Sequence, residues 1–280
     1  MAEVLGLEAV RRALAEDCAA ADVTTRLLGA AVEKPAALRF VAEAACVVAG
    51  LPVVELTFRE LDPSATLHAH VADGGCAEPD AIIATVSARA GALLSGERVA
   101  LNFLQRLSGI ATLTRRAVDA VAGTGGGARI THTRKTTPGL RALEKYAVRA
   151  GGGANHRFGL DDAVLIKDNH RALAGGLRPA VERARGAVGH LVKIEVEVDS
   201  LAELDEALAL GVDAVLLDNM DLATLGEAVR RARGRALTEA SGGIRPATAA
   251  AIAATGVDLL SVGWLTHSAP ALDVALDVAL

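Results

Sequence analysis

The amino-acid sequence predicts an α/β protein whose C-terminal part is a closed or nearly closed barrel of parallel strands. Short apolar runs with polar ends alternate there with helical segments, and successive strand ends after Glu197 recur about every 21 or 22 residues, the length of one compact strand-and-helix unit. The chain is 51% hydrophobic but only 2% aromatic. A core of Ala, Val and Leu suits a parallel sheet that Ala-rich helices cover.

The first 109 or so residues follow another pattern, with short strands and turn-rich connections. Residues 7–15 predict a helix, and residues 82–86 predict a strand. A second helix is predicted over residues 95–106, with Ser95 as its N-cap. The change of pattern near residue 110 indicates two domains.

Polar and charged residues gather at the ends of the strands predicted after residue 110. The strands whose apolar runs are clearest are 164–166, 191–198, 212–217, 237–240 and 259–262. In β/α barrels the chemistry takes place at the C-terminal ends of the strands. The candidate residues at those ends are Arg134, Lys135, Lys167, Glu197, Asp218, Ser241 and Gly263.

A cationic segment stands out in an otherwise acidic chain. Between Ile130 and His170 there are seven Lys or Arg residues against four Asp or Glu, although the formal net charge of the chain is −5. A solvated basic face is the alternative, but Pro, Gly, Asn and His interrupt the run and remove a continuous helical spacing. The segment therefore predicts a cleft for a small, strongly anionic ligand.

Two carboxylates, Glu197 and Asp218, are expected at the ends of adjacent strands. Hard oxygen ligands of this kind suit Mg²⁺ when phosphate supplies further oxygens. The alternative is that they only neutralise Lys167 and Arg134.

The segment Ser241-Gly242-Gly243 precedes a helix that starts near Pro246. Together with Gly263 it predicts a loop whose backbone N–H groups hold a phosphate.

Other classes of protein fit the sequence poorly. Charges interrupt every apolar run before it reaches the length of a membrane span. Cys18, Cys46 and Cys76 are odd in number and lack metal-ligand spacing, which favours a reducing, cytoplasmic compartment over a disulfide framework or a zinc site. An acidic balance also argues against nucleic acid as a partner.

Several motifs resemble the quinolinate phosphoribosyltransferase family, also called carboxylating nicotinate-nucleotide pyrophosphorylases. The most specific block is residues 133–170, with TRKTTPGLR (133–141), EKYAVR (144–149), GGG (151–153), NHR (155–157) and LIKDNH (165–170). Further matching segments are 97–104, 108–112, 195–199, 217–219 and 265–268. The resemblance runs nearly end to end.

The resemblance implies an N-terminal α/β sandwich domain followed by an open α/β barrel of parallel strands. The sandwich would comprise residues 1–109, joined by the C-terminal segment 268–280, and the barrel residues 110–267. The implied enzyme is a pentosyltransferase that joins quinolinate to phosphoribosyl pyrophosphate with Mg²⁺. It releases pyrophosphate and CO₂ and leaves nicotinate mononucleotide, a step of NAD biosynthesis, in a homodimer or larger assembly.

The same resemblance implies roles for individual residues. The quinolinate carboxylates would be surrounded by Arg134, His156, Arg157 and Lys167, with Arg98 contributed by the partner subunit. Lys135 would contact the phosphoribosyl donor, and Glu197 and Asp218 would bind Mg²⁺ and the ribose hydroxyls. The 5′-phosphate would lie against Ser241, Gly242, Gly243 and Gly263. The residues with catalytic roles would be Lys135, Lys167, Glu197 and Asp218.

Some positions depart from the family's usual pattern, notably His132, Glu43, Cys46 and Trp264. Trp264 is the only Trp and follows the predicted phosphate-loop Gly263. Its ring either fills a gap in an aromatic-poor core or interface, or narrows the site and changes substrate choice. Two other functions therefore stay open, a paralogue that acts on a different pyridine carboxylate and a non-catalytic, metabolite-binding oligomer.

Overall fold

The structure, a computed structural model, describes residues 2–278 and forms two compact units. The first unit comprises Met1–Arg115, Lys135–Gly152 and Trp264–Leu280, and the barrel unit comprises Arg116–Arg134 and Gly153–Gly263. The segment Lys135–Gly152 belongs to the first unit because its helix α5 (Arg141–Ala150) packs with helix α1 (Ala2–Glu16).

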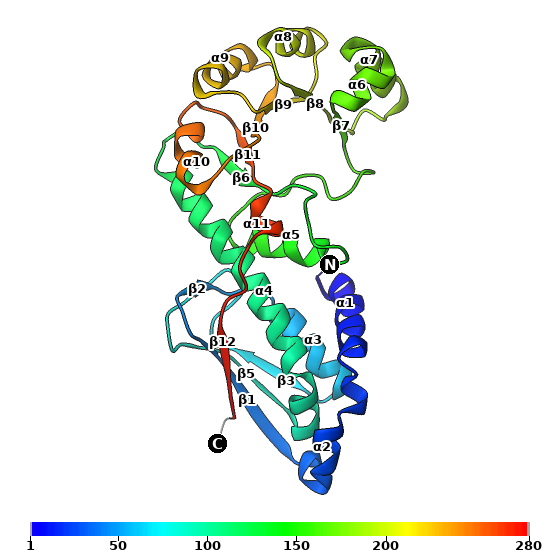
Figure 1. Cartoon of the computed structure of the whole chain (residues 1–280), viewed down its shortest axis with the longest axis vertical. Coiled ribbons are helices and arrows are strands. Elements are labelled where there is room, and N and C mark those ends of the chain that lie inside the picture. The colour runs from blue at the N-terminus through cyan, green and yellow to red at the C-terminus, as the bar shows by residue number, and fades with distance from the viewer. Residues whose placement is uncertain (1, 279–280) are drawn as a thin grey trace. The chain divides into compact units, whose positions relative to one another are not determined.

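The first unit contains a four-stranded antiparallel sheet with the strand order β12-β1-β5-β3 (Figure 1). Its strands are β1 (Pro35–Ala42), β3 (Thr66–Ala69), β5 (Ile82–Arg89) and β12 (Val274–Val278), and a separate pair is formed by β2 (Cys46–Val47) and β4 (Cys76–Ala77). Its helices besides α1 and α5 are α2 (Val23–Leu27), α3 (Leu51–Leu61), most of α4 (Ala90–Ala122) and α11 (Trp264–His267). The C-terminal strand β12 thus completes a sheet that the N-terminal half begins.

Apolar side chains between this sheet and its helices form the core of the first unit. Phe40 on β1 and Phe58 on α3 are fully buried and meet edge to face, with ring centroids 6.3 Å apart. Along β1 and β5 buried and more exposed side chains largely alternate, because every second side chain points toward this core. Burial of this apolar face stabilises the sheet against the helices.

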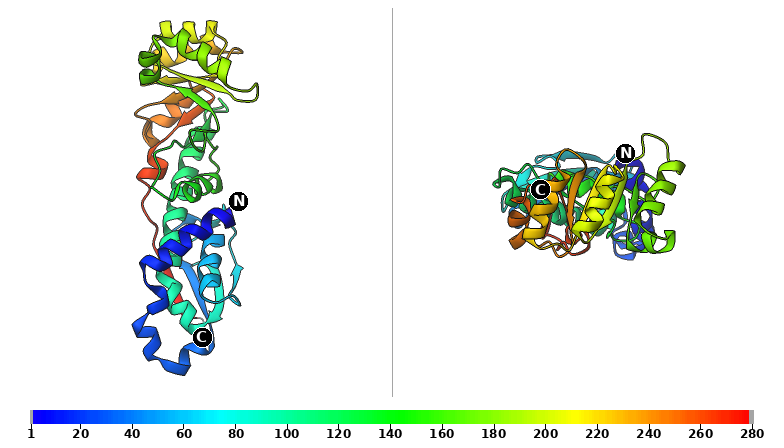
Figure 2. Two further views of the ribbon diagram at one scale, coloured as in Figure 1. Left: turned by 90° about the vertical axis from the view of Figure 1, so that its right-hand side faces the viewer. Right: turned by 90° about the horizontal axis from the view of Figure 1, so that it is seen from above.

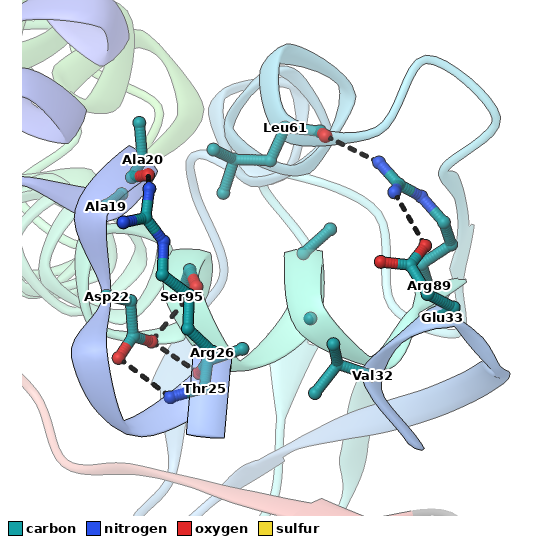
Figure 3. Close-up of a pocket in the computed structure, with 12 residues that line it drawn as sticks. Ala19, Ala20, Asp22, Thr25, Arg26, Val32, Glu33, Leu61, Arg89 and Ser95 are labelled. Carbon is teal, nitrogen blue, oxygen red and sulfur yellow. Dashed lines mark hydrogen bonds and ion pairs between the residues drawn. The ribbon is translucent and has the colours of Figure 1, made fainter. Parts of the chain in front are cut away.

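The helix predicted over residues 95–106 is longer than expected, and the prediction of Ser95 as its N-cap was wrong. Helix α4 begins at Ala90, directly after β5, so that Ser95 lies inside it. The Ser95 hydroxyl donates instead to Asp22 Oδ2 at 3.0 Å (Figure 3). Asp22 is itself the N-cap of α2 and accepts from the Thr25 backbone N–H. In the sequence, a serine that hydrogen-bonds to a side chain of another element looks the same as a serine that caps the N-terminus of a helix.

The barrel unit is built on a six-stranded sheet with the order β6-β11-β10-β9-β8-β7, and every pairing in it is parallel. Its strands are β6 (Arg129–Thr131), β7 (Val164–Ile166), β8 (Ile194–Val198), β9 (Ala214–Asp218), β10 (Leu237–Ser241) and β11 (Leu259–Ser261). Strands β6 and β7 are the two edges of the sheet, so the sheet is open between them. The predicted open α/β barrel of parallel strands is confirmed, and the closed form is not the one observed.

Helices lie against one side of the parallel strands, as the left view of Figure 2 shows. They are α6 (Asp168–Ala174), α7 (Leu177–Ala187), α8 (Leu201–Ala209), α9 (Leu222–Ala232) and α10 (Pro246–Ala253). Ser200 caps α8 and Asp221 caps α9 by accepting backbone N–H groups of the first turn. The other side of the strands carries the polar side chains described below.

Among residues 2–278, no helix has both the length and the apolar character that crossing a membrane requires.

Gly109 is a position in α4 where a side chain cannot be added. A Cβ there would lie 2.0 Å from the backbone oxygen of Pro270, which leads the chain toward β12. We expect Gly109→Ala to lower the free energy of unfolding by about 1–3 kcal/mol, because backbone must shift to admit the methyl group. Urea unfolding measures this change.

The matched control is Gly6→Ala in α1 of the same unit, where the nearest heavy atom would be 3.5 Å away. We expect that variant to be as stable as the wild type or slightly more stable. Equal stability of the two variants would contradict close packing of α4 against the Pro270 backbone.

Candidate functional site

The register of the central strands places the predicted acidic and phosphate-loop residues on one face of the sheet. Glu197 of β8 pairs with Leu216 of β9, and Asp218 of β9 pairs with Ser241 of β10. Side chains two residues apart on a strand share a face, and side chains in register across parallel strands do so too. Glu197, Asp218 and Ser241 therefore project from the same face.

The Lys167 ammonium and the Glu197 carboxylate form an ion pair. Lys167 follows β7 and lies in register with Glu197 through the β7–β8 pairing, which explains their meeting. The carboxylate of Asp218 accepts instead from the side-chain amide of Asn219, at 2.6 Å. Glu197 thus neutralises a cation in this structure, whereas Asp218 accepts from a neutral amide.

The loop after β10 approaches the end of β9 so closely that one position must be glycine. Gly242 has φ +90°, and a Cβ there would lie 2.1 Å from Asn219 Oδ1. Gly243 also has a positive φ, of +58°, but open space surrounds its missing Cβ. Two successive residues with positive φ turn the backbone sharply at the C-terminal end of the strand.

A cleft of about 600 Å³ opens beside β7, at the edge of the sheet. Its lining includes Arg134, Arg157, Lys167 and Arg183, and no carboxylate is among its described lining residues. Burial lowers the pKa of Arg157, and the nearby charge of Arg134 lowers it further. Two guanidinium groups held this close repel each other, so an anion that binds both is favoured.

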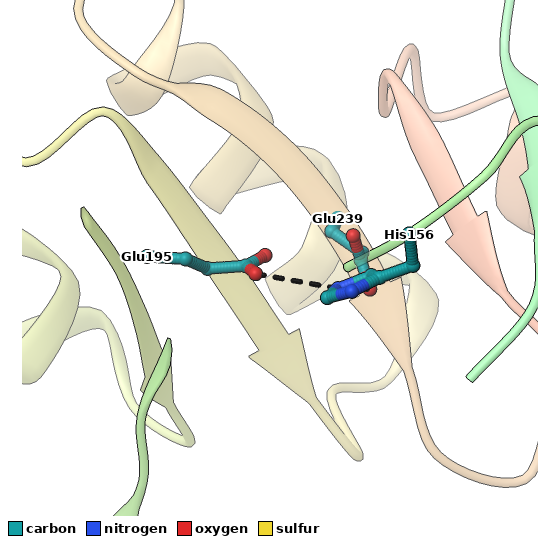
Figure 4. Close-up of side chains that lie close together, drawn as sticks. All are labelled: His156, Glu195 and Glu239. Atoms are coloured by element: carbon teal, nitrogen blue, oxygen red, sulfur yellow. Dashed lines mark ion pairs between the residues drawn. The ribbon is translucent and has the colours of Figure 1, made fainter. Parts of the chain in front are cut away.

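A buried cluster of three ionisable side chains lies on the strand face that carries Glu197 (Figure 4). His156 Nε2 is 3.4 Å from Glu195 Oε2 and 3.4 Å from Glu239 Oε1. The side chains are 14%, 12% and 2% exposed, in the order His156, Glu195, Glu239. Burial by itself lowers the pKa of His156, but the two carboxylates outweigh it and raise the pKa to about 9. Burial raises the pKa of Glu195.

Residues Glu195 and Glu239 were not predicted as part of the site. Alternation along β8 puts Glu195 on the face of Glu197, and alternation along β10 puts Glu239 on the face of Ser241. That alternation was the available signal. The partner, His156, comes from a loop with no regular spacing, so the sequence does not indicate that the three side chains meet.

The segment that carries the most specific motif is held by a buried acid in the first unit. Glu144 is fully buried and accepts from Arg106, the Thr137 hydroxyl and the Thr137 backbone N–H, at 2.7, 2.7 and 3.0 Å. A buried carboxylate with this many donors is well compensated. Glu144 therefore fixes the Thr-Thr-Pro-Gly turn that follows Arg134 and Lys135.

The other predicted site residues belong to the first unit. Arg98 is exposed on α4, and Lys135 is exposed, with its backbone oxygen accepting from the Thr266 hydroxyl at 2.7 Å. The remaining residues of the predicted set, Arg134, His156, Arg157, Lys167, Glu197, Asp218, Ser241, Gly242, Gly243 and Gly263, belong to the barrel unit.

The four residues that depart from the usual pattern have different surroundings. Cys46 is buried in β2, and Glu43 is exposed. His132 is fully buried and its Nε2 lies 3.0 Å from Asn155 Oδ1. Trp264 is half-buried at the start of α11 in the first unit.

Comparison with known protein families decides what this arrangement is. The C-terminal domain of quinolinate phosphoribosyl transferase matches residues 110–277, and the N-terminal domain matches residues 22–108. The chain belongs to the quinolinate phosphoribosyltransferase family. Two names for this family of transferase enzymes occur among the relatives.

Nicotinate-nucleotide pyrophosphorylase [carboxylating] of Mycobacterium leprae is 48% identical, over 83% of this chain and 82% of that protein. Quinolinate phosphoribosyltransferase [decarboxylating] 1 of Nicotiana glauca is 38% identical, over 96% of this chain and 81% of that protein. The solved structure of the nicotinate-nucleotide pyrophosphorylase from Francisella tularensis is 36% identical, with a TM-score of 0.91 over 100% of this chain and 98% of that one. The fold of this quinolinate phosphoribosyltransferase family member is thus the fold of its relatives.

Proposed function

We propose that this family member transfers the phosphoribosyl group of phosphoribosyl pyrophosphate to the nitrogen of quinolinate, with loss of CO₂. The products are nicotinate mononucleotide, pyrophosphate and CO₂, and the reaction supplies NAD biosynthesis. The observation that carries the proposal is the cationic cleft with Arg134, Arg157 and Lys167, the last of which is paired with Glu197 of the carboxylate face. Membership of the family supports the same reaction.

The charge of the cleft suits a dicarboxylate better than a monocarboxylate. Each guanidinium binds one carboxylate through two parallel hydrogen bonds, and the ammonium of Lys167 adds a point charge. One carboxylate cannot satisfy Arg134 and Arg157 together with Lys167. Quinolinate carries two adjacent carboxylates, so it neutralises the cleft more fully.

The reaction needs little acid–base chemistry from the protein. Departure of pyrophosphate leaves an oxocarbenium-like carbon on the ribose, and the pyridine nitrogen attacks it with a free lone pair. The resulting positive charge on nitrogen stabilises the electron pair that stays on the adjacent ring carbon when the C–C bond to the neighbouring carboxylate breaks, and this carbon then takes up one proton. Positioning of the two substrates and exclusion of water are therefore the main tasks of the protein. Lys135 is proposed to contact the donor and to stabilise the leaving negative charge.

Mg²⁺ is the metal that we propose for this site, with Asp218 and Glu197 as its protein ligands. The fit rests on the donor set, because the two carboxylates lie on one face of adjacent strands. When bound, the metal would neutralise charge on the pyrophosphate. Ser241, Gly242, Gly243 and Gly263 are proposed to hold the 5′-phosphate.

Removal of the Asp218 carboxylate tests the metal proposal. We expect Asp218→Asn to raise the KM for phosphoribosyl pyrophosphate about tenfold or more, because one ligand charge is lost. Quinolinate affinity should change little, and a chelator should abolish turnover of the wild type. The control is Asp221→Asn, which keeps a capping side chain on α9. Full activity in chelator would rule out the metal.

A panel of pyridine mono- and dicarboxylates tests the substrate. We expect quinolinate to be used at least about a hundredfold more efficiently than nicotinate, since a ligand with one carboxylate fewer makes fewer charge-assisted contacts with the cations of the cleft. Nucleotide formation and CO₂ release are measured separately. If the wild type prefers another acid and the Trp264→Ala variant prefers quinolinate, the paralogue is favoured. Failure of every acid to react would favour a non-catalytic role.

We also propose a homodimer in which Arg98 of one subunit completes the site of its partner. Removal of Arg98 should cost about 1.5–3 kcal/mol of substrate binding, as for one charge-assisted contact. Inactive Arg98→Ala and Lys167→Ala proteins should regain about a quarter of wild-type activity after subunit exchange, because each mixed dimer has one intact site. No recovery, with exchange verified by mass, would argue for sites contained in one chain.

A further inference from the structure

The backbone at Lys135 is anchored by a buried residue of helix α11. The Thr266 hydroxyl donates to the backbone oxygen of Lys135, at 2.7 Å. Thr266 is fully buried, whereas Lys135 is exposed. The bond therefore fixes the peptide group that joins Lys135 to Thr136, at the base of an exposed cationic side chain.

Further along the same segment, the turn is held from helix α5. The Thr137 backbone N–H donates to Glu144 Oε2 at 3.0 Å, and the Thr137 hydroxyl donates to Glu144 Oε1 at 2.7 Å. Glu144 is fully buried, where a carboxylate without donors would be costly. The segment from Lys135 to Thr137 is thus bonded at both ends to buried side chains.

Arg106 of helix α4 connects these two anchors. Its Nη2 donates to Glu144 Oε1 at 2.7 Å and also to the backbone oxygen of Thr266. Its Nη1 donates to the backbone oxygen of Ala269, at 2.8 Å. Helices α5 and α11 lie side by side at this place (Figure 1). One guanidinium therefore binds both the side chain that holds Thr137 and the helix that holds Lys135.

The position of Thr266 in the chain adds a second link. Helix α11 begins at Trp264, directly after Gly263, which is proposed to contact the 5′-phosphate of the donor. Thr266 lies in the same short helix. The backbone that leaves one proposed donor contact thus anchors the backbone of the other, Lys135.

We propose that Thr266 is a positioning residue for the phosphoribosyl donor, because its hydroxyl fixes the backbone from which Lys135 reaches the pyrophosphate group. Glu144 and Arg106 support it by holding the same segment and helix α11. The proposal rests on the proposed function for the role of Lys135. A lysine ammonium reaches its ligand through a flexible stem, so a fixed backbone removes part of the ordering cost that binding otherwise carries.

A double-mutant cycle tests the proposal, with the affinity for phosphoribosyl pyrophosphate as the readout. Calorimetry is done with Mg²⁺ and with phthalate, which has two adjacent carboxylates but no ring nitrogen that could react. We expect Thr266→Val to weaken donor binding about fivefold in the wild-type background and less than about twofold in the Lys135→Ala background. Equal losses in both backgrounds, or no loss in folded Thr266→Val protein, would overturn the proposal.

Two conservative variants separate loss of the bond from a change in packing. Thr266→Ser keeps the hydroxyl, so we expect donor affinity to stay within about twofold of the wild type. Thr266→Ala removes the hydroxyl without placing a methyl group against the Lys135 oxygen, and it should weaken donor binding as Thr266→Val does. Phthalate affinity should be unchanged in all three variants. A loss of phthalate affinity as large as the loss of donor affinity would overturn the proposal.

The matched control is Thr57→Val in helix α3 of the same unit. Thr57 is also fully buried, and its hydroxyl donates to the backbone oxygen of Val53 at 2.8 Å. We expect Thr57→Val and Thr266→Val to lower the free energy of unfolding to a similar extent in urea, but only Thr266→Val to weaken donor binding. An equal loss of donor affinity in the control would show that lowered stability is the cause and would overturn the proposal.

A ligand-free measurement separates failure of this proposal from failure of the proposed function. The NMR order parameter of the Thr136 amide reports on the peptide group that Thr266 holds, because the Lys135 carbonyl and the Thr136 N–H share one plane. We expect it to be lower in Thr266→Val than in the wild type and unchanged in Thr57→Val. Wild-type protein that neither binds nor converts the donor refutes the proposed function, and the order parameter then decides the anchoring. An order parameter that Thr266→Val leaves unchanged would overturn the proposal in either case.

Discussion

The register of the parallel strands β8, β9 and β10 is the constraint on which the site depends. Because side chains alternate along each strand, a shift of one residue would turn Glu197 or Asp218 to the helix-covered side. Apolar residues such as Val196 and Leu217, which are buried on that side, oppose the shift. The hydrophobic packing of the helices therefore also determines where the charges lie.

Charge compensation is the second requirement, and it differs between the polar groups of the protein. Glu144 has strong donors and serves to hold the turn with Thr137. Glu195 Oε1 has no hydrogen-bond partner among the described residues, and Glu239 Oε1 has only its 3.4 Å contact with His156 Nε2, so the burial of these carboxylates is costly. The cationic cleft differs from both, because burial and the charge of Arg134 lower the pKa of Arg157, while the charges of Glu195 and Asp162 raise it.

Backbone geometry restricts the chain at two places where side chains would collide. Gly109 lets the segment through Pro270 pass α4 on the way to β12, and Gly242 lets the loop after β10 approach Asn219. The close approach at Gly109 contributes to the stability of the first unit. The close approach at Gly242 shapes the loop that is proposed to hold a phosphate through its backbone N–H groups.

The sequence by itself determined the fold class and the family, because strand periodicity and short motifs are local properties. It indicated Glu197 and Asp218 through their positions at strand ends. It did not indicate that Ser95 lies inside α4, because a cap and a long-range hydrogen bond look the same in sequence. Only the tertiary structure decided that His156 meets Glu195 and Glu239, since their contact joins a loop to two strands that are far apart in sequence.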